Sequence, residues 1–170
     1  MNITILCVFY PPINSSAAIQ ISHLVDELAN EGHKIEVITP DNSIKDSISY
    51  QKKKNINILR FKTGKMTDIS LFKRAINEIL MPFKIILTIL IKSIKMQESD
   101  GIICWSPPIF FTPLVIFLKL RNKCPCYLIL RDIFPRWAKD LKLIKNKFLY
   151  YLFNIFFKLQ CFSSDFIGVQ

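Results

Sequence analysis

Residues 2–39 read NITILCVFYPPINSSAAIQISHLVDELANEGHKIEVIT, and this stretch decides the fold. Residues 2–9 form a nearly continuous apolar run, which is typical of a strand buried on both faces of a parallel sheet. Residues 16–31 repeat apolar side chains at three- and four-residue steps, which predicts an amphipathic helix. Residues 34–39 predict a second strand, so the whole stretch predicts a right-handed βαβ unit. The apolar helical positions are Ile21, Leu24, Val25, Leu28 and Ala29.

The same alternation of strands and helices continues to the end of the sequence. Further strands are predicted at residues 56–61, 101–105, 126–130 and 165–169, and further helices at 69–95, 109–121 and 144–160. The polar segment 41–55 is expected to be a surface excursion, and Pro82 is expected to break or kink the helix that contains it. We therefore expect an α/β fold, a Rossmann-like doubly wound parallel sheet with helices on both faces, as one domain over residues 1–170.

The composition indicates a folded chain with an anionic partner or a highly charged surface. The chain has 170 residues, of which 51% are hydrophobic, and a formal net charge of +10. A charge of this sign favours nucleic acid, a membrane surface or a phosphate-bearing substrate, although surface lysines can also keep a hydrophobic chain soluble. No nucleic-acid motif is present, so we do not expect a nucleic-acid partner.

The five cysteines are interpreted as small hydrophobic side chains of the core. Their odd number, without a secretory signal peptide, fits a reducing cytoplasm. Cys124 and Cys126 are separated by one residue, which is not the spacing of zinc or redox sites, and no metal site is expected. The cysteines are Cys7, Cys104, Cys124, Cys126 and Cys161.

Two apolar stretches are long enough to raise the question of a membrane span. Prolines interrupt residues 101–118 and lysines interrupt residues 79–94, so we reject a transmembrane helix for both. The helix predicted at 69–95 is nevertheless basic and amphipathic, which is typical of a helix lying on anionic lipid. The alternative is a core helix whose lysines are solvated. The candidate membrane-facing residues are Lys73, Lys84, Lys92 and Lys95.

Three loops are expected to meet at the carboxyl end of the sheet, where ligands bind in this class of fold. The first loop leads into a helix N-terminus, which favours an anion such as a diphosphate, and Ser15 and Ser16 can bind it or only cap the helix. Ser106 follows the strand at 101–105. Asp132 follows the strand at 126–130 and is the candidate catalytic base or acceptor-orienting group, with Arg131 beside it. The alternative for this pair is a structural ion pair.

Four motifs resemble the N-terminal domain of the family-4 glycosyltransferases with the GT-B fold, and most closely the fucosaminyl-transferase-like group of O-antigen and capsule synthesis. They are FYPP at residues 9–12, LANEGH at 28–33 before IEVIT, DGII at 100–103 before SPP at 106–108, and RDIFP at 131–135 before LIKNK at 143–147. The likeness spans nearly all of the chain.

The resemblance implies a retaining transfer from a nucleotide-sugar co-substrate to a polyprenyl-diphosphate-linked acceptor, without a metal or other cofactor. It implies that this domain binds the acceptor and is peripheral on the inner face of the cytoplasmic membrane. Ser15 and Ser16 stand where the family usually has paired glycines, and Arg136 stands where it tends to have an acidic residue. The family's donor site lies in a C-terminal domain that this sequence does not contain.

Three interpretations are open for a chain with only this domain. The chain can be an acceptor-binding half that works with a separate donor-binding chain. It can be a truncated gene product without activity. It can also be a non-catalytic module that binds a membrane or a protein partner.

Overall fold

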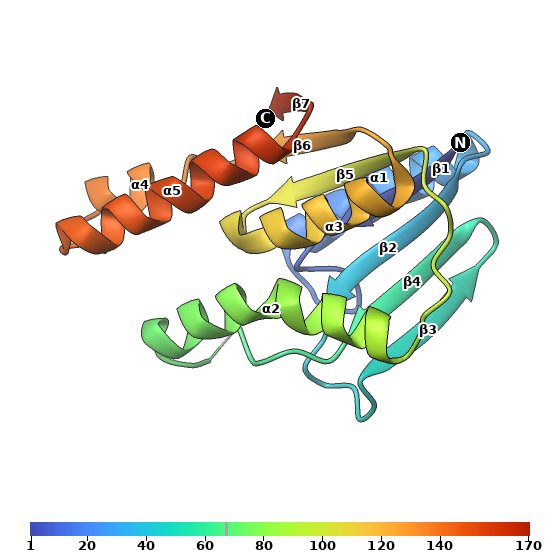
Figure 1. Ribbon diagram of the computed structural model, residues 1–170, viewed down its shortest axis with the longest axis horizontal. Coiled ribbons are helices and arrows are strands. Elements are labelled where there is room, and N and C mark those ends of the chain that lie inside the picture. The colour runs from blue at the N-terminus through green and yellow to red at the C-terminus, as the bar shows by residue number, and fades with distance from the viewer. Residues whose placement is uncertain (67) are drawn as a thin grey trace.

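The structure is a computed structural model that describes residues 1–66 and 68–170. Its centre is one sheet of seven strands in the order β3-β4-β2-β1-β5-β6-β7 (Figure 1). Every neighbouring pair is parallel except β3 and β4, which are antiparallel. The strands are β1 (Asn2–Leu6), β2 (Lys34–Pro40), β3 (Ile48–Lys53), β4 (Ile56–Phe61), β5 (Gly101–Ser106), β6 (Cys126–Leu130) and β7 (Phe166–Val169).

Helices cover both faces of the sheet. Helix α1 lies on one face, whereas α2, α3 and α5 lie side by side on the other (Figure 1). We call these three helices the helical layer. The helices are α1 (Ser16–Asn30), α2 (Leu71–Ile91), a 3-10 turn (Ile109–Phe111) that leads into α3 (Thr112–Asn122), α4 (Arg136–Asp140) and α5 (Lys147–Ser163).

The alternation of side chains along the strands divides the core in two. In β1, Ile3 and Ile5 pack toward α1, while Leu6 packs toward the helical layer. Helix α1 contributes Ile21 and Val25 to the first core. Because both faces of the inner strands are buried, the apolar runs of the sequence lack the alternation of a half-exposed sheet. The predicted Rossmann-like sheet with helices on both faces is confirmed.

The segment 41–55 differs from the expectation, because it contains a strand. Strand β3 pairs antiparallel with β4 at the edge of the sheet, and its residues are mostly exposed. An edge strand buries little apolar surface, so its sequence has the polar composition of a loop. The sheet is therefore mixed, although its six other strands are parallel, as predicted.

The helix predicted at 69–95 is also shorter than expected. Helix α2 continues through Pro82 and ends at Ile91, with Lys92 as its C-cap. Ser93 then has a positive φ of 47°, and Lys95 lies in the loop beyond the helix. The prediction that Lys95 lies on this helix is thus wrong. Pro82 and its neighbour Met81 are buried, so packing holds the helix where the proline removes a backbone hydrogen bond.

Within the part of the chain that the structure describes, no helix combines the length and the apolar character needed to cross a bilayer. The apolar residues at 101–118 instead form β5, the 3-10 turn and part of α3.

Candidate functional site

Three loops meet at the carboxyl edge of the sheet. The strands β1, β5 and β6 are parallel neighbours, so the loops that follow them leave the sheet at the same edge. Between β1 and β5 the strand order reverses direction, because β2 and β4 lie on one side of β1 while β5, β6 and β7 follow on the other. Such a switch point is where open α/β sheets bind ligands. The structure therefore brings the loops of Ser15, Ser106 and Asp132 to one edge.

The loop after β1 ends in the first turn of α1. Ser15 is the N-cap, and its hydroxyl oxygen accepts a hydrogen bond from the backbone N–H of Ala18 at 3.2 Å. Ser16 is the first helical residue and is exposed. One of the two expected roles of Ser15, capping, is thus observed. Since Ser15 satisfies only one N–H of the first turn, the other free N–H groups still favour an anion.

A buried arginine anchors this loop, and sequence reasoning missed it. The Arg60 guanidinium, at the end of β4, donates a hydrogen bond to the carbonyl oxygen of Pro11 and lies 5.9 Å from the centre of the Tyr10 ring. Its Nη1 is 3.8 Å from a carboxylate oxygen of Asp41, which follows β2. The signal in the sequence was Arg60 itself, next to the last residue of the mainly apolar strand INILRF, because a buried arginine needs partners.

Ser106 lies at the end of β5 but does not open onto solvent. The residue is buried, and its hydroxyl donates a hydrogen bond to Oε1 of Gln160 at 3.3 Å. The side-chain amide of Gln160 in turn donates to the carbonyl oxygen of Pro108 at 3.0 Å. Gln160 of α5 therefore holds the Ser-Pro-Pro loop in place. In this arrangement the Ser106 hydroxyl has a structural role.

Arg131 and Asp132 follow β6 and point to different environments. The Arg131 guanidinium lies 5.7 Å from the centre of the Trp105 ring, in a cation–π contact. Asp132 is exposed, and no ion pair joins it to Arg131 among the described residues. The alternative of a structural pair between these neighbours is therefore not seen. The carboxylate of Asp132 is open to a ligand that approaches the edge.

An aromatic cluster holds the loop of Asp132 in place. Phe134, two residues beyond Asp132, lies 5.2 Å from Phe153 of α5 between ring centres and 5.9 Å from Trp137 of α4. Phe110, from the turn after β5, lies 5.0 Å from Phe156 of α5. Edge-to-face aromatic contacts stabilise packing beyond the buried area alone. The loops after β5 and β6 are thus fixed to the same helix.

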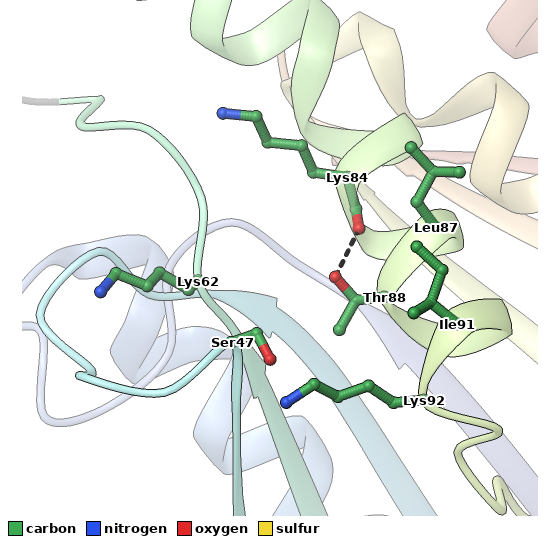
Figure 2. Close-up of a pocket in the computed structure, with 7 residues that line it drawn as sticks. All are labelled: Ser47, Lys62, Lys84, Leu87, Thr88, Ile91 and Lys92. Atoms are coloured by element: carbon green, nitrogen blue, oxygen red, sulfur yellow. Dashed lines mark hydrogen bonds between the residues drawn. The ribbon is translucent and has the colours of Figure 1, made fainter.

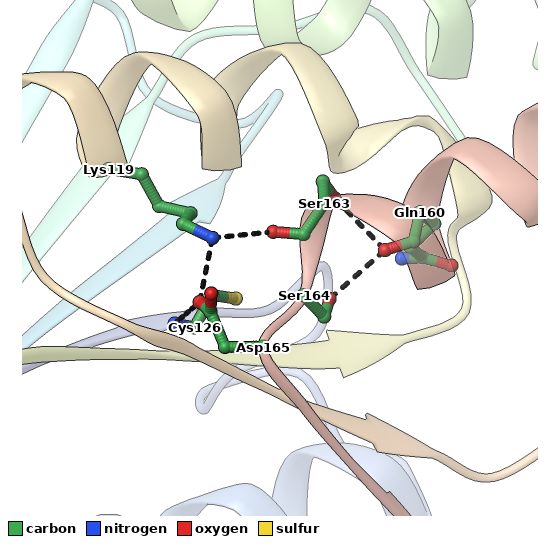
Figure 3. A network of polar contacts seen from close by, with 6 residues as sticks. All are labelled: Lys119, Cys126, Gln160, Ser163, Ser164 and Asp165. Atoms are coloured by element: carbon green, nitrogen blue, oxygen red, sulfur yellow. Dashed lines mark hydrogen bonds and ion pairs between the residues drawn. The ribbon is translucent and has the colours of Figure 1, made fainter.

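Polar contacts also tie α5 to the sheet at its other end (Figure 3). The Lys119 ammonium of α3 donates to the Ser163 carbonyl oxygen at 3.1 Å and pairs with Asp165 at 2.7 Å. Asp165 also accepts the backbone N–H of Cys126 at 2.7 Å. The Lys119 hydrogen bond and the Cys126 N–H lower the pKa of Asp165. This network fixes the C-terminal end of α5, which carries Gln160, against β6.

Two titratable side chains near the carboxyl edge remain protonated at neutral pH. Burial raises the pKa of Cys7 to about 12, and burial together with the Asp26 carboxylate raises the pKa of Tyr10 to about 12. Neither group therefore supplies a thiolate or phenolate nucleophile. Four of the five cysteines are buried and all are free, which confirms their interpretation as core residues. Among the described residues, no cluster of three His, Cys, Asp or Glu side chains could hold a metal ion.

Two surface cavities flank the sheet, and Asp132 lines neither. The smaller one, of about 60 Å³, lies where β1, β2 and β4 end and includes Asp41, Asn42 and Thr63. The larger one, of about 310 Å³, lies between α2 and the segments next to β3 and β4 (Figure 2). We call the larger one the α2 groove. It is lined by Ser47, Lys62, Lys84, Leu87, Thr88, Ile91 and Lys92.

Comparison with known proteins relates the fold to glycosyltransferases. No protein-family model matches the chain, and no curated protein matches it in sequence. Among solved structures, sucrose-phosphate synthase from Thermosynechococcus elongatus is similar with a TM-score of 0.64 and 11% identity, over 98% of this chain and 41% of that one. Trehalose 6-phosphate synthase from Burkholderia multivorans gives 0.57 and 10% identity, over 98% of this chain and 39% of that one.

Starch synthase IV from Arabidopsis thaliana, whose catalytic domain was solved with ADP and acarbose, is similar with a TM-score of 0.52 and 13% identity. The match covers 77% of this chain and 34% of that one. This chain thus spans less than half of each of these three glycosyltransferase structures. At such low identities the comparison establishes the fold, which matches a Rossmann-like half of a GT-B glycosyltransferase.

Proposed function

We propose that the chain is the acceptor-binding half of a retaining glycosyltransferase that transfers a sugar from a nucleotide-sugar to a polyprenyl-diphosphate-linked saccharide in surface polysaccharide synthesis. The observation that carries the proposal is that the loops after β1, β5 and β6 leave the sheet at one edge, at the switch point of the strand order. The fold that holds these loops is similar to part of sucrose-phosphate synthase. The resemblance of four sequence motifs to the O-antigen and capsule enzymes of family 4 supports the finer assignment.

Asp132 is the group we assign to the acceptor hydroxyl. Its carboxylate is exposed at the edge, and its loop is anchored through Phe134 to α5. A carboxylate held in this way accepts a hydrogen bond from a sugar hydroxyl and can take its proton during transfer. The anchoring keeps the oxygen near one position, which is what a reacting hydroxyl requires.

The N-terminus of α1 is the group we assign to the diphosphate of the acceptor. Ser16 is exposed there, and Arg60 holds the preceding loop through Pro11 and Tyr10. Backbone N–H groups and the helix dipole stabilise negative charge at this position. Arg131 adds a positive charge at the neighbouring loop. Ser106 supports the site through Gln160.

The nucleotide-sugar is assigned to a second domain or a separate chain. In this proposal the reaction needs no metal, and the leaving diphosphate is stabilised outside this chain. The acceptor is anchored in the inner face of the cytoplasmic membrane by its lipid. Lys73 and Lys84 of α2, its C-cap Lys92 and Lys95 in the following loop would then lie toward anionic headgroups.

The test measures binding of a short-chain acceptor, farnesyl-diphosphate-linked N-acetylglucosamine, to the chain in the absence of vesicles. We expect Asp132→Ala to weaken binding by about tenfold or more, since a hydrogen bond to a charged group contributes about 1.5–3 kcal/mol. When a donor-binding partner is supplied, the same variant is expected to abolish sugar transfer. Asp140→Ala, at an exposed position of α4, is the matched control.

Unchanged binding and turnover in the Asp132 variant would remove this residue from the site. A second candidate function is a non-catalytic module that binds membranes, and the exposed apolar residues of the helical layer favour it. That module would bind vesicles but would show no affinity for the saccharide diphosphate. A truncated product without activity would show neither transfer nor acceptor binding.

A further inference from the structure

Trp105, next to the last residue of β5, has a polar atom that the fold leaves without a partner. The residue is 6% exposed, and its indole N–H is buried with no hydrogen-bond partner among the residues that the structure describes. Buried polar groups in folded proteins are nearly always paired, because an unpaired group gives up its hydrogen bond to water for nothing in return. At the edge of the sheet that carries the candidate site, such a donor points to an acceptor supplied by a ligand.

Arg131 lies on the same face of the sheet as Trp105. In the register of β5 and β6, Trp105 is opposite Ile129, and Arg131 follows Ile129 by two residues, which places it on that face. Its guanidinium lies 5.7 Å from the centre of the Trp105 ring. Across residues 1–66 and 68–170, no carboxylate forms an ion pair with Arg131. The five N–H donors of this half-buried guanidinium are therefore free of any such partner.

The first turn of α1 lies on this face as well. Trp105 and Ile21 of α1 belong to one buried cluster, whereas the helical layer packs on the opposite face (Figure 1). Strand β1, which leads to α1, is the neighbour of β5 in the sheet. Ser15 caps one N–H of the first turn, so the N–H groups beside it have no partner within the helix. The indole, the guanidinium and the helix N-terminus thus share one face at one edge.

These three groups are all hydrogen-bond donors. The indole and guanidinium side chains have no acceptor atom, and the N–H groups of a helix N-terminus also only donate. A water molecule could accept one of these hydrogen bonds, but its own hydrogens would then need acceptors that this set does not supply. An anion with several oxygen atoms satisfies the whole set, because the guanidinium and the helix dipole both favour negative charge.

A second arginine lies over an aromatic ring nearby, and the comparison shows which of the two can move. The Arg60 guanidinium donates to the carbonyl oxygen of Pro11 and lies 3.8 Å from a carboxylate oxygen of Asp41. These contacts hold Arg60 in place, so it anchors the loop. Arg131 has no comparable ion pair within the described part of the chain. Since a bidentate contact with phosphate is stronger than a cation–π contact, Arg131 is the arginine that a bound phosphate would draw from its ring.

We propose that Trp105 is a further ligand-binding residue, whose indole N–H donates a hydrogen bond to the diphosphate at the N-terminus of α1, and that Arg131 moves from the Trp105 ring to the same diphosphate. The inference rests on the proposed function, which places a diphosphate there. Neighbouring strands lie about 4.8 Å apart, so β1 and β6 are separated by about 10 Å across β5. Two linked phosphates span more of this width than a single phosphate does, so the ligand class is a diphosphate ester.

The experiment follows the indole N–H of Trp105 directly, in proton–nitrogen correlation spectra of the isotope-labelled full chain. The chain has two tryptophans, and the variant Trp137→Phe identifies which of the two indole signals belongs to Trp105. We expect inorganic pyrophosphate to move the Trp105 indole proton downfield in a saturable manner, because a hydrogen bond to an oxygen acceptor deshields the proton. Inorganic phosphate and sulfate at equal ionic strength are expected to move it less.

The role of Arg131 is tested by removing its charge. Arg131→Gln is expected to weaken pyrophosphate binding by about tenfold or more, since hydrogen bonds to charged groups are among the strong ones. At saturating pyrophosphate the Trp105 indole proton of this variant should still move. Arg121→Gln is the matched control, because it removes the same charge from an exposed position in the last turn of α3, which leads to the start of β6. This control is expected to bind pyrophosphate as the unaltered chain does.

Trp105→Phe removes the indole N–H and keeps an aromatic ring at the same place. We expect this variant to bind pyrophosphate about tenfold more weakly, because one hydrogen bond to a charged ligand is lost. Trp105 is buried, so circular dichroism has to show native folding before the affinity is compared. The spectra of the unaltered chain test the inference even if this variant does not fold.

An indole signal of Trp105 that stays in place while pyrophosphate binds would overturn the inference, and the N–H would then be paired with an ordered water only. Equal shifts with phosphate and with pyrophosphate would overturn the assignment of a diphosphate ester. Failure of the proposed function is distinguishable. If farnesyl-diphosphate-linked N-acetylglucosamine binds in a manner that depends on Asp132 but leaves the Trp105 signal unmoved, only the role of Trp105 is refuted. If neither this ligand nor pyrophosphate binds, both proposals are refuted.

Discussion

At the scale of single residues, Glu36 is the most unusual group in the core. It lies on β2 and is 3% exposed, and one of its carboxylate oxygens has no hydrogen-bond partner among the described residues. The other oxygen accepts the backbone N–H of Gln97 at 3.3 Å. Burial raises the pKa of Glu36 to about 7, although the Gln97 N–H and the Arg121 charge oppose the shift. The folded chain therefore keeps this carboxyl protonated up to about pH 7.

This pKa predicts that stability falls as pH rises. The folded pKa of about 7 exceeds the unfolded value of 4.5, so the folded state binds the extra proton between these values. The contribution of this group to the free energy of unfolding is full below about pH 4.5 and is lost as pH rises through about 7. The loss lowers the free energy of unfolding by about 3 kcal/mol. We expect Glu36→Gln to stabilise the chain at about pH 8 much more than at about pH 5.

Urea unfolding at the two pH values measures this effect. The exposed Glu27→Gln on α1 is the matched control, and it is expected to leave the pH dependence as it is. If Glu36→Gln shifted the unfolding midpoint equally at both pH values, the carboxyl would not be the source of the pH dependence.

At the scale of elements, the first turn of α1 has two separable roles. Ser15 caps the helix, and the free N–H groups beside it are assigned to a diphosphate. Aspartate is as good an N-cap as serine but carries a negative charge. We therefore expect Ser15→Asp to keep the melting temperature within a few degrees and to weaken binding of farnesyl-diphosphate-linked N-acetylglucosamine by about tenfold. Ser15→Asn, a neutral cap, is the control and should bind normally.

Calorimetry would give both quantities on the same samples. Equal affinities of the Ser15→Asp and Ser15→Asn variants would mean that no diphosphate lies at this helix N-terminus. Ser15 would then be a cap and nothing more.

Buried elements were predictable from the sequence, whereas elements at the edge were not. The bounds of β4 and β6 match the prediction because both are short apolar runs closed by polar residues. Strand β3 was missed because edge strands are polar. Helix α4 was missed because its five residues, RWAKD, are too few to show a helical period. The end of α2 was misplaced because its apolar pattern continues through Ile94, which is buried in the following loop.

The candidate site was only partly predictable for a related reason. Residues that follow a strand, such as Asp132, can be placed at an edge from the order of elements alone. Gln160 and Arg60 act on loops that are distant in sequence, and contacts of that kind depend on how helices pack across the sheet. Ser106 was placed at the correct edge, but its burial under α5 could not be read from neighbouring residues.

At the scale of the whole molecule, strand order connects the fold to the proposed function. Right-handed connections between parallel strands place α1 on one face of the sheet and the helical layer on the other. The reversal between β1 and β5 creates the switch point at the carboxyl edge. Helix α1 carries Asp26 and Glu27 and no lysine or arginine, whereas the helical layer carries seven lysines and arginines and one acidic residue, so the edge that carries Asp132 adjoins a basic layer of helices.

The most direct measurement is photo-crosslinking with a diazirine-bearing farnesyl-diphosphate-linked N-acetylglucosamine, followed by mass spectrometry of the peptides. We predict that the label is found in residues 10–16 and 131–135, on both sides of the switch point, and that unlabelled ligand prevents it. Labelling confined to the amino edge of the sheet, for example in residues 32–34 and 97–100, would contradict the assignment of the acceptor to the loops after β1 and β6.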